Sequence, residues 1–376
     1  MYPTPNPQTD YAVYIHVPFC RKRCPYCDFY LRTDANRRLN PFIEELPTEW
    51  RQRLKHPIFA DGKPYSLFFG GGTPSILTTE IVGQWITEWR NLGLPESAEI
   101  TLEANPEDFA KFSAFCQAGI NRLSIGCQSL DDGELKELGR THTSNDIHVA
   151  YETARSSGFA SISLDFIYAL PFGSEKGWKD TLTEAITMSP DHISCYALTV
   201  EEGTSYGQRW KRGEFTLPTE DAIERQLQLT FELLEPAGYD RYELSNFAHP
   251  GHESKHNLAY WTGRPYLACG PSAHGYDGVG RYANISDVDK WRDLILADKL
   301  PDVGWETLTP EQHRIETIAM QLRLKTGLQF DNPLLQIEQS KVDQVVHAGW
   351  GVLSGSRLQL TSSGLAREAA ITRFLL

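Results

Sequence analysis

Short apolar runs alternate with longer amphipathic segments along the first half of the chain. The apolar runs predict β-strands at 11–17, 66–69, 99–103, 122–127, 161–166 and 192–198. The segments between them predict helices at 39–54, 79–91, 107–117, 144–156 and 174–187. Strand–helix alternation of this kind predicts parallel strands joined by crossover helices. We therefore expect an α/β fold with a partial (β/α)6 barrel of the TIM type.

Polar or glycine-rich motifs follow the predicted strands at the points where the strands end. These motifs are Cys20 to Cys27, Gly70 to Thr73, Glu103, Gln128 and Asp165. Functional residues of α/β barrels lie at the carboxyl ends of the parallel strands, which together form one rim. The sequence therefore predicts that a single pocket at this rim collects all of these motifs.

Three cysteines in the loop after the first strand carry the strongest signal. Cys20, Cys24 and Cys27 have the spacing C-x3-C-x2-C. Three thiolates on one tight loop can converge on a metal centre, but they are one ligand short of a structural zinc site or an ordinary iron–sulfur cluster. Two interpretations stay open here. One is a zinc site completed by His16 or a distant cysteine, and the other is a [4Fe–4S] cluster with an open position on its fourth iron.

The other rim motifs each allow a structural and a ligand-binding interpretation. Three successive glycines form either a tight turn or a close approach to a ligand, and we favour the ligand because a turn needs fewer glycines. Glu103 and Asp165 either cap helices or, with the amide of Gln128, bind hydroxyl and ammonium groups of a polar ligand. Arg140 pairs either with a ligand carboxylate or with a surface acid.

The second half of the chain departs from the barrel pattern. Residues 221–234 have helical periodicity, but the stretch 241–276 shows little helical or alternating order and is rich in His, Asn and aromatic residues. Such a composition is typical of ordered loops around a site. The motif His256-Asn257-x-x-Tyr260-Trp261 lies in this segment. Its side chains either bind a ligand or cover the barrel mouth.

The last part of the chain predicts a small separate module. Helical patterns at 311–324 and 331–347 precede a hairpin pattern within 351–364 and a last helix. This order resembles a winged-helix module, which we expect to serve as a lid or docking surface because no arginine-rich recognition helix is present. The expected units are a tail (1–10), a barrel core (11–235), an extension near the barrel mouth (236–305) and this module (306–376).

Composition narrows the classes of function. The formal net charge of −13 argues against a nucleic-acid surface, which needs clustered Lys and Arg. No run approaches the roughly 18 apolar residues of a membrane span, and the start of the chain lacks an apolar signal core. We therefore expect no membrane insertion and a cytoplasmic location. In that reducing compartment Cys116, Cys127, Cys195 and Cys269 are expected to be free thiols.

In combination, these motifs resemble the radical S-adenosylmethionine (SAM) superfamily. From about residue 11 onward the chain is similar to the branch that contains oxygen-independent coproporphyrinogen III dehydrogenase and the heme chaperone HemW. The resemblance implies that Cys20, Cys24 and Cys27 ligate a [4Fe–4S] cluster and that SAM chelates the open iron. The residues that it assigns to the SAM site are Tyr14, Tyr26, Gly71, Gly72, Thr73, Glu103, Gln128, Arg140 and Asp165.

Two features favour the heme-chaperone side of this resemblance. Phe29 stands where the dehydrogenase carries a further cysteine, two residues after the third ligand. The motif that begins at His256 is similar to a signature of the HemW branch, whose members bind heme and pass it to an acceptor. The resemblance therefore implies a carrier, and catalytic porphyrinogen decarboxylation is the alternative.

The same resemblance implies a heme site in the second half of the chain. It assigns heme ligation or contact to His256, because histidine is a natural axial ligand of heme iron. The residues expected to shape the pocket around the macrocycle are Asn257, Tyr260 and Trp261. His274 and Cys269 are reserve ligands, in a segment that departs from the GxGAHS pattern of the branch. The implied partners are a heme-acceptor protein, with membrane-associated respiratory proteins as one class, and an electron donor for the cluster.

Overall fold

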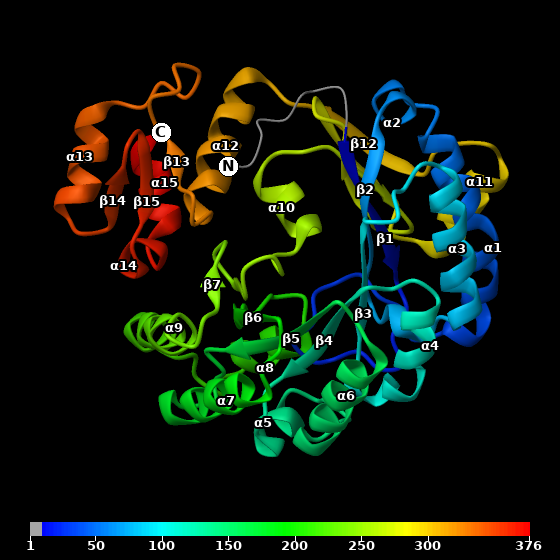
Figure 1. Cartoon of the computed structure of the whole chain (residues 1–376), viewed down its shortest axis with the longest axis horizontal. Helices are drawn as coiled ribbons and strands as arrows, with labels where there is room; N and C mark the ends of the chain where they lie inside the picture. Colours follow the sequence, from blue (N-terminus) through cyan, green and yellow to red (C-terminus); the bar gives the residue numbers. More distant parts are fainter. Residues whose placement is uncertain (1–9) are drawn as a thin grey trace.

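The computed structural model describes residues 10–376 as a curved twelve-stranded sheet with an outer layer of helices and a small three-stranded sheet (Figure 1). Six neighbouring strands of the large sheet run parallel. They are β1 (Asp10–Val17), β2 (Lys63–Gly71), β3 (Glu99–Ala104), β4 (Arg122–Gln128), β5 (Ser161–Tyr168) and β6 (His192–Ala197). All six predicted strands are therefore confirmed, and with them the partial barrel.

Helices cover the outer face of this sheet (Figure 1). The α-helices are α1 (Ala35–Arg53), α2 (Pro57–Asp61), α3 (Thr79–Asn91), α4 (Phe112–Gln117), α5 (Asp132–Glu137), α6 (Ser144–Ser157), α7 (Glu175–Met188), α8 (Ser205–Lys211) and α9 (Glu220–Leu234). Two 3₁₀ helices, η1 (Pro74–Ile76) and η2 (Pro106–Lys111), follow β2 and β3. The predicted helix 107–117 is therefore divided between η2 and α4. Side-chain oxygens of Thr78, Thr143 and Ser174 cap α3, α6 and α7 by accepting backbone N–H groups.

Alternation along the strands separates the apolar core from the barrel interior. In β5, Ile162, Leu164 and Phe166 are fully buried in the hydrophobic core. Ser163 and Asp165 face the other way and line an internal cavity. Successive strand residues point to opposite faces of a sheet, so one strand serves both the core and the cavity.

Residues 236–305 are more regular than their sequence indicates. They form β7 (Asp240–Arg241), β8 (Asn246–Ala248), α10 (Lys255–Trp261), β9 (Tyr266–Cys269), β10 (His274–Tyr276), β11 (Gly280–Asn284), α11 (Val288–Leu296) and β12 (Asp302–Thr307). β9 pairs in parallel with β1, and β8 pairs antiparallel with β6, so the segment extends the sheet at both ends. The expectation of little order was wrong because strands of two to six residues are too short to show alternation.

The C-terminal elements form a compact module beside α9 and α10 (Figure 1). They are α12 (Pro310–Arg323), β13 (Leu328–Gln329), α13 (Gln339–His347), β14 (Gly351–Ser354), β15 (Arg357–Leu360), α14 (Ser362–Leu365) and α15 (Glu368–Leu375). The strand order β13-β15-β14 is antiparallel, as a winged-helix-like module requires. The predicted helix 331–347 forms only from Gln339, and the predicted division at 305/306 falls inside β12. The expected tail lies almost wholly outside the described residues.

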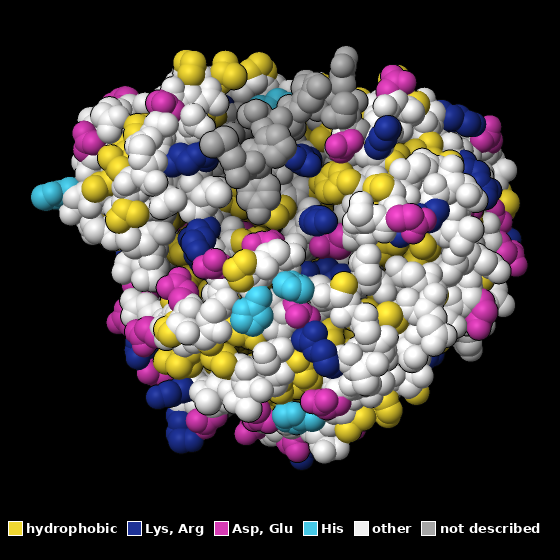
Figure 2. Space-filling model, in the orientation of Figure 1, with side chains coloured by type: hydrophobic (Ala, Val, Ile, Leu, Met, Phe, Trp, Pro, Cys, Tyr) yellow, Lys and Arg dark blue, Asp and Glu magenta, His cyan; other side chains and the backbone are white. Residues whose placement is uncertain are grey.

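The surface agrees with a chain of mixed charge. On the face shown in Figure 2, Lys and Arg side chains are interspersed with Asp and Glu. No helix within residues 10–376 is long and apolar enough to cross a membrane. None of the seven cysteines, all of which lie in the described part of the chain, forms a disulfide bond.

Candidate functional site

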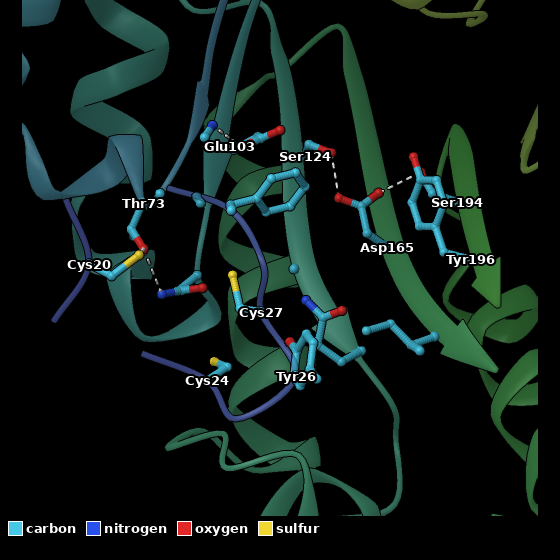
Figure 3. A pocket seen from close by; sticks show the side chains of 18 of the residues that line it. Cys20, Cys24, Tyr26, Cys27, Thr73, Glu103, Ser124, Asp165, Ser194 and Tyr196 are labelled. Carbon is cyan, nitrogen blue, oxygen red and sulfur yellow. Dashed lines mark hydrogen bonds between the residues drawn. The ribbon is translucent and has the colours of Figure 1, made fainter. Parts of the chain in front are cut away.

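One cavity of about 910 Å³ lies inside the curved sheet and gathers the rim motifs. The predicted site residues that line it are Cys20, Cys24, Cys27, Tyr26, Gly71, Gly72, Thr73, Glu103, Gln128, Arg140, Asp165 and Asn257. Figure 3 shows the three cysteines on one side of the cavity, with Asp165 and Tyr196 on the other. The prediction that the motifs line one pocket is therefore confirmed.

The cysteine loop is fixed by hydrogen bonds to the sulfur atoms. Thr73 Oγ1 donates to Cys20 Sγ at 3.2 Å, and Arg140 Nη1 donates to Cys24 Sγ at 3.4 Å. Burial raises the pKa of the Cys20 and Cys27 thiols. Burial thus favours the neutral thiols, whereas the two hydrogen-bond donors would stabilise the negative charge of the sulfurs as metal ligands.

The mononuclear zinc site that the spacing left open is not assembled. Within residues 10–376, no three His, Cys, Asp or Glu side chains lie close enough together to hold a single metal ion. His16 is also engaged elsewhere, since its Nδ1 lies 3.0 Å from the Tyr14 hydroxyl and its Nε2 lies 3.2 Å from the Tyr30 carbonyl oxygen.

Close packing against neighbouring residues explains the glycines that follow β2. Gly71 has φ +106°, and a Cβ at this position would lie 2.5 Å from the His16 ring. A Cβ on Gly72 would lie 2.7 Å from the Phe19 carbonyl oxygen. Contact with β1 and the cysteine loop therefore already excludes side chains here, so the ligand interpretation is not needed to explain the glycines. Their backbone still borders the cavity.

Glu103 is the most perturbed acid at the rim. Its Oε2 accepts the backbone N–H of Gly71 at 3.0 Å. Burial, with a smaller effect from the nearby Asp165, raises the pKa of Glu103 to about 7. A cationic ligand group beside Glu103 would stabilise the ionised form of this carboxyl group. The position therefore suits the binding of such a ligand.

We expect Glu103→Gln to change the pH dependence of stability. The folded-state pKa of about 7 exceeds the ordinary value of 4.5, so the wild-type protein loses stability as pH rises from about 4.5 through 7. The variant should match wild type at pH 4 and exceed it by about 1–2 kcal/mol at pH 8.5, because cavity water reduces the roughly 3 kcal/mol of the full shift. Urea unfolding at both pH values measures this, and equal differences at the two would contradict the assignment.

Asp165 is held by three hydroxyl groups that the sequence analysis did not single out. Ser124 and Ser194 each donate to its carboxylate at 2.6 Å (Figure 3), and Ser163 donates to it at 2.7 Å. These serines and Asp165 occupy inward positions of β4, β5 and β6. Polar residues at every second position of otherwise apolar strands were the available signal, because a filled barrel core would be apolar there.

The Arg140 guanidinium forms hydrogen bonds to the cysteine loop and to nearby neutral groups, and it forms no ion pair with an acid of the described chain. Besides Cys24, it donates from Nη2 to Asn105 Oδ1 at 2.7 Å and to the Gly126 carbonyl oxygen at 3.2 Å. Gln128 lies nearby with φ 70°, an uncommon conformation for a residue with a side chain. Strained backbone of this kind is typical of functional sites.

Of the two tyrosines predicted for the SAM site, Tyr26 lines the cavity and Tyr14 does not. Tyr26 lies in the cysteine loop and lines the cavity, and burial raises the pKa of its hydroxyl. Tyr14 lies on β1 and packs beside both Phe68 and His256, at ring-centroid distances of 6.0 and 6.1 Å. Within the described part of the chain, Tyr14 is not among the residues that line this cavity.

The motif that begins at His256 forms α10, which closes the inner end of the cavity. His256 is 1% exposed, with Nδ1 3.2 Å from Ser66 Oγ and Nε2 2.8 Å from the Tyr260 hydroxyl. Its ring stacks on Phe68 at 4.8 Å, and burial lowers its pKa to about 3. Asn257 lines the cavity, whereas Trp261 lies under the Arg323 guanidinium at 5.5 Å. Axial ligation by His256 therefore stays a prediction that requires its ring to leave both partners.

The reserve heme ligands are not part of the cavity lining in the described structure. Cys269 is fully buried in β9, and burial raises its pKa well above the ordinary value. His274 is exposed at the start of β10. A Cβ at Gly270 between them would lie 2.4 Å from the His16 carbonyl oxygen, so this glycine permits the close approach of its loop to β1.

Comparisons with known proteins place these features in context. Residues 14–185 match the family described as the radical SAM superfamily. The heme chaperone HemW of Mycobacterium tuberculosis (strain H37Rv) is 34% identical over 384 positions, which cover 99% of this chain and 96% of that protein. HemW of Bacillus subtilis (strain 168) is 33% identical and covers 84% of each chain. The solved structure of the radical SAM enzyme coproporphyrinogen III oxidase (HemN) from Escherichia coli covers 98% of this chain and 90% of its own, with a TM-score of 0.80 and 21% identity, which shows a shared fold.

Proposed function

Because the chain belongs to the HemW heme-chaperone family of the radical SAM superfamily, we propose that it binds heme and transfers it to an acceptor protein. The observation that carries this proposal is the similarity to HemW proteins over almost the whole length of both chains. Phe29 supports it, because this side chain lines the cavity and is 67% exposed where the related dehydrogenase has a further cysteine. An exposed phenyl ring at the rim suits the flat macrocycle of heme.

We further propose that Cys20, Cys24 and Cys27 hold a [4Fe–4S] cluster. The donor set fits, since three thiols border one cavity and two of them accept hydrogen bonds. When bound and reduced, such a cluster supplies an electron to the sulfonium of SAM. The surrounding residues fix the loop and limit access of water to the sulfur atoms.

The residues proposed to hold SAM are the rim residues assigned from the resemblance. Glu103, Gln128 and Asp165 offer acceptors to the ammonium and hydroxyl groups of SAM, and the backbone of Gly71 to Thr73 lies beside them. Arg140 acts chiefly by fixing the cysteine loop, in keeping with its bond to Cys24. The acceptor protein and the electron donor are proposed by class alone, with a cytoplasmic site of action.

We expect the anaerobically reconstituted protein to bind hemin with a shifted Soret band and to yield it to apomyoglobin, the probe acceptor. Incubation of the reduced protein with SAM and coproporphyrinogen III should give no protoporphyrinogen IX, because the chain is proposed to carry heme and not to decarboxylate porphyrinogen. Absorbance and product chromatography measure the two reactions. Repeated turnover of coproporphyrinogen, or a spectrum unchanged by hemin, would contradict the proposal.

A further inference from the structure

Below the rim, the cavity reaches a buried arginine at the opposite end of the barrel. Arg122 is the first residue of β4, is 4% exposed and lines the cavity. Its Nη1 donates to Ser161 Oγ and to the His252 carbonyl oxygen, both at 2.8 Å. Both partners are neutral. Among the ion pairs formed within residues 10–376, none includes Arg122.

A buried cation without an anionic partner is unusual. Buried charges are normally paired, because the loss of hydration has to be offset. A guanidinium group carries five N–H donors, and the hydrogen bonds of Arg122 to described residues both leave from one nitrogen. The remaining donors are therefore free for a group that enters the cavity.

Glu99, an acid on the adjacent strand β3, is already committed to another contact. Glu99 accepts the backbone N–H groups of Lys255 and His256 at 3.1 and 3.0 Å, and the Ser254 hydroxyl lies 3.5 Å away. These bonds fix the start of α10 over the cavity. No ion pair within 4.0 Å joins Glu99 to Arg122 in the described chain, so Glu99 does not neutralise the guanidinium directly.

Among the side chains beside Arg122, Thr101 adds a second unsatisfied group and His192 adds no charge. Thr101 is opposite Arg122 in the register of β3 and β4, lines the cavity, and has a buried Oγ1 without a hydrogen-bond partner among residues 10–376. His192 is engaged by Ser163 Oγ at 2.7 Å and by the Tyr242 hydroxyl at 2.8 Å. Burial, with the Arg122 charge, keeps the pKa of His192 well below its usual value, so this ring is neutral.

We propose that this inner end of the cavity is a carboxylate subsite that receives a propionate group of heme. Arg122 pairs with the carboxylate, and the Thr101 hydroxyl donates to the same group from the adjacent strand. The subsite thereby anchors the porphyrin edge inside the barrel, on the side of the cavity that α10 closes. This inference rests on the proposed heme-carrier function and names the part of heme that the inner cavity recognises.

The test is titration of the reconstituted protein with hemin and with hemin dimethyl ester, in which both propionates are masked. Wild-type protein should bind hemin about tenfold or more tightly than the ester, and Arg122→Met should remove this preference by weakening hemin alone. Thr101→Val should weaken hemin a few-fold without lowering the thermal unfolding temperature, because it removes a hydroxyl that has no partner in the free protein. Arg90→Met, on the outer helix α3, is the matched control.

The outcomes separate this inference from the heme-carrier proposal. Wild-type protein that binds hemin and its ester equally, or an Arg122→Met protein that keeps the preference, would overturn the subsite and leave heme carriage intact. Wild-type protein that binds neither compound would overturn both. If Arg122→Met fails to fold, the test rests on the ester comparison with wild type and on the Thr101→Val titration. The subsite is excluded if Thr101→Val binds hemin with unchanged affinity and the wild-type protein does not prefer hemin over the ester.

Discussion

Cys24→Ser protein, reconstituted anaerobically with iron and sulfide, is expected to retain well under one iron per chain, against about four in wild type. Cys24 is one of three cysteines of the loop that line the cavity, and its sulfur accepts a hydrogen bond from Arg140. Serine is a poor cluster ligand, and two remaining thiolates cannot retain the cluster. Iron and sulfide content and the broad charge-transfer absorbance measure the loss.

Cys116→Ser is the matched control for this experiment. Cys116 is a half-buried thiol on α4, and it does not line the cavity within the described structure. Its variant should retain the full iron content. A Cys24→Ser protein with wild-type iron and sulfide would show that the cluster is not held by this loop.

His256→Ala should lower the free energy of unfolding by about 2–4 kcal/mol. The substitution removes the ring that stacks on Phe68 and leaves the Ser66 and Tyr260 hydroxyl groups without their partner. Urea unfolding of the protein without heme measures this loss. His347→Ala, which changes an exposed residue at the end of α13, should alter stability by less than about 0.5 kcal/mol.

The same variant tests heme ligation separately from stability. If His256 swings out to bind the iron, hemin bound to His256→Ala should lose the spectrum of imidazole ligation, and added imidazole should restore it. An unchanged Soret band with the variant would instead assign His256 to support of Tyr260 and Phe68. Both measurements use conditions in which the variant remains folded.

Local patterns in the chain were sufficient to predict the framework of the site. The six parallel strands and the convergence of Cys20, Glu103 and Asp165 on one rim follow from short-range alternation together with the common direction of the strands. The three cysteines lie within eight residues of one another, so their loop is encoded almost entirely by neighbouring positions. Motifs of this kind are visible without knowledge of distant contacts.

The parts that could not be predicted depend on contacts between distant segments. β9 joins the sheet beside β1, although the chain separates them by most of the barrel. Ser66 and His256 are 190 positions apart and form a hydrogen bond that turns the histidine away from the cavity. No local periodicity reports such a pairing, because it depends on how complete elements pack.

The sequence by itself therefore determined the cysteine loop, the order of the parallel strands and the family of the chain, since each is a matter of residue type and short-range spacing. Only the tertiary structure decided what each polar group faces. It placed Arg122 and Thr101 side by side at the inner end of the cavity, and it enclosed His256 between Ser66 and Tyr260. The physical reason is that burial and pairing of a polar side chain depend on the surrounding chain, whereas its chemical type does not.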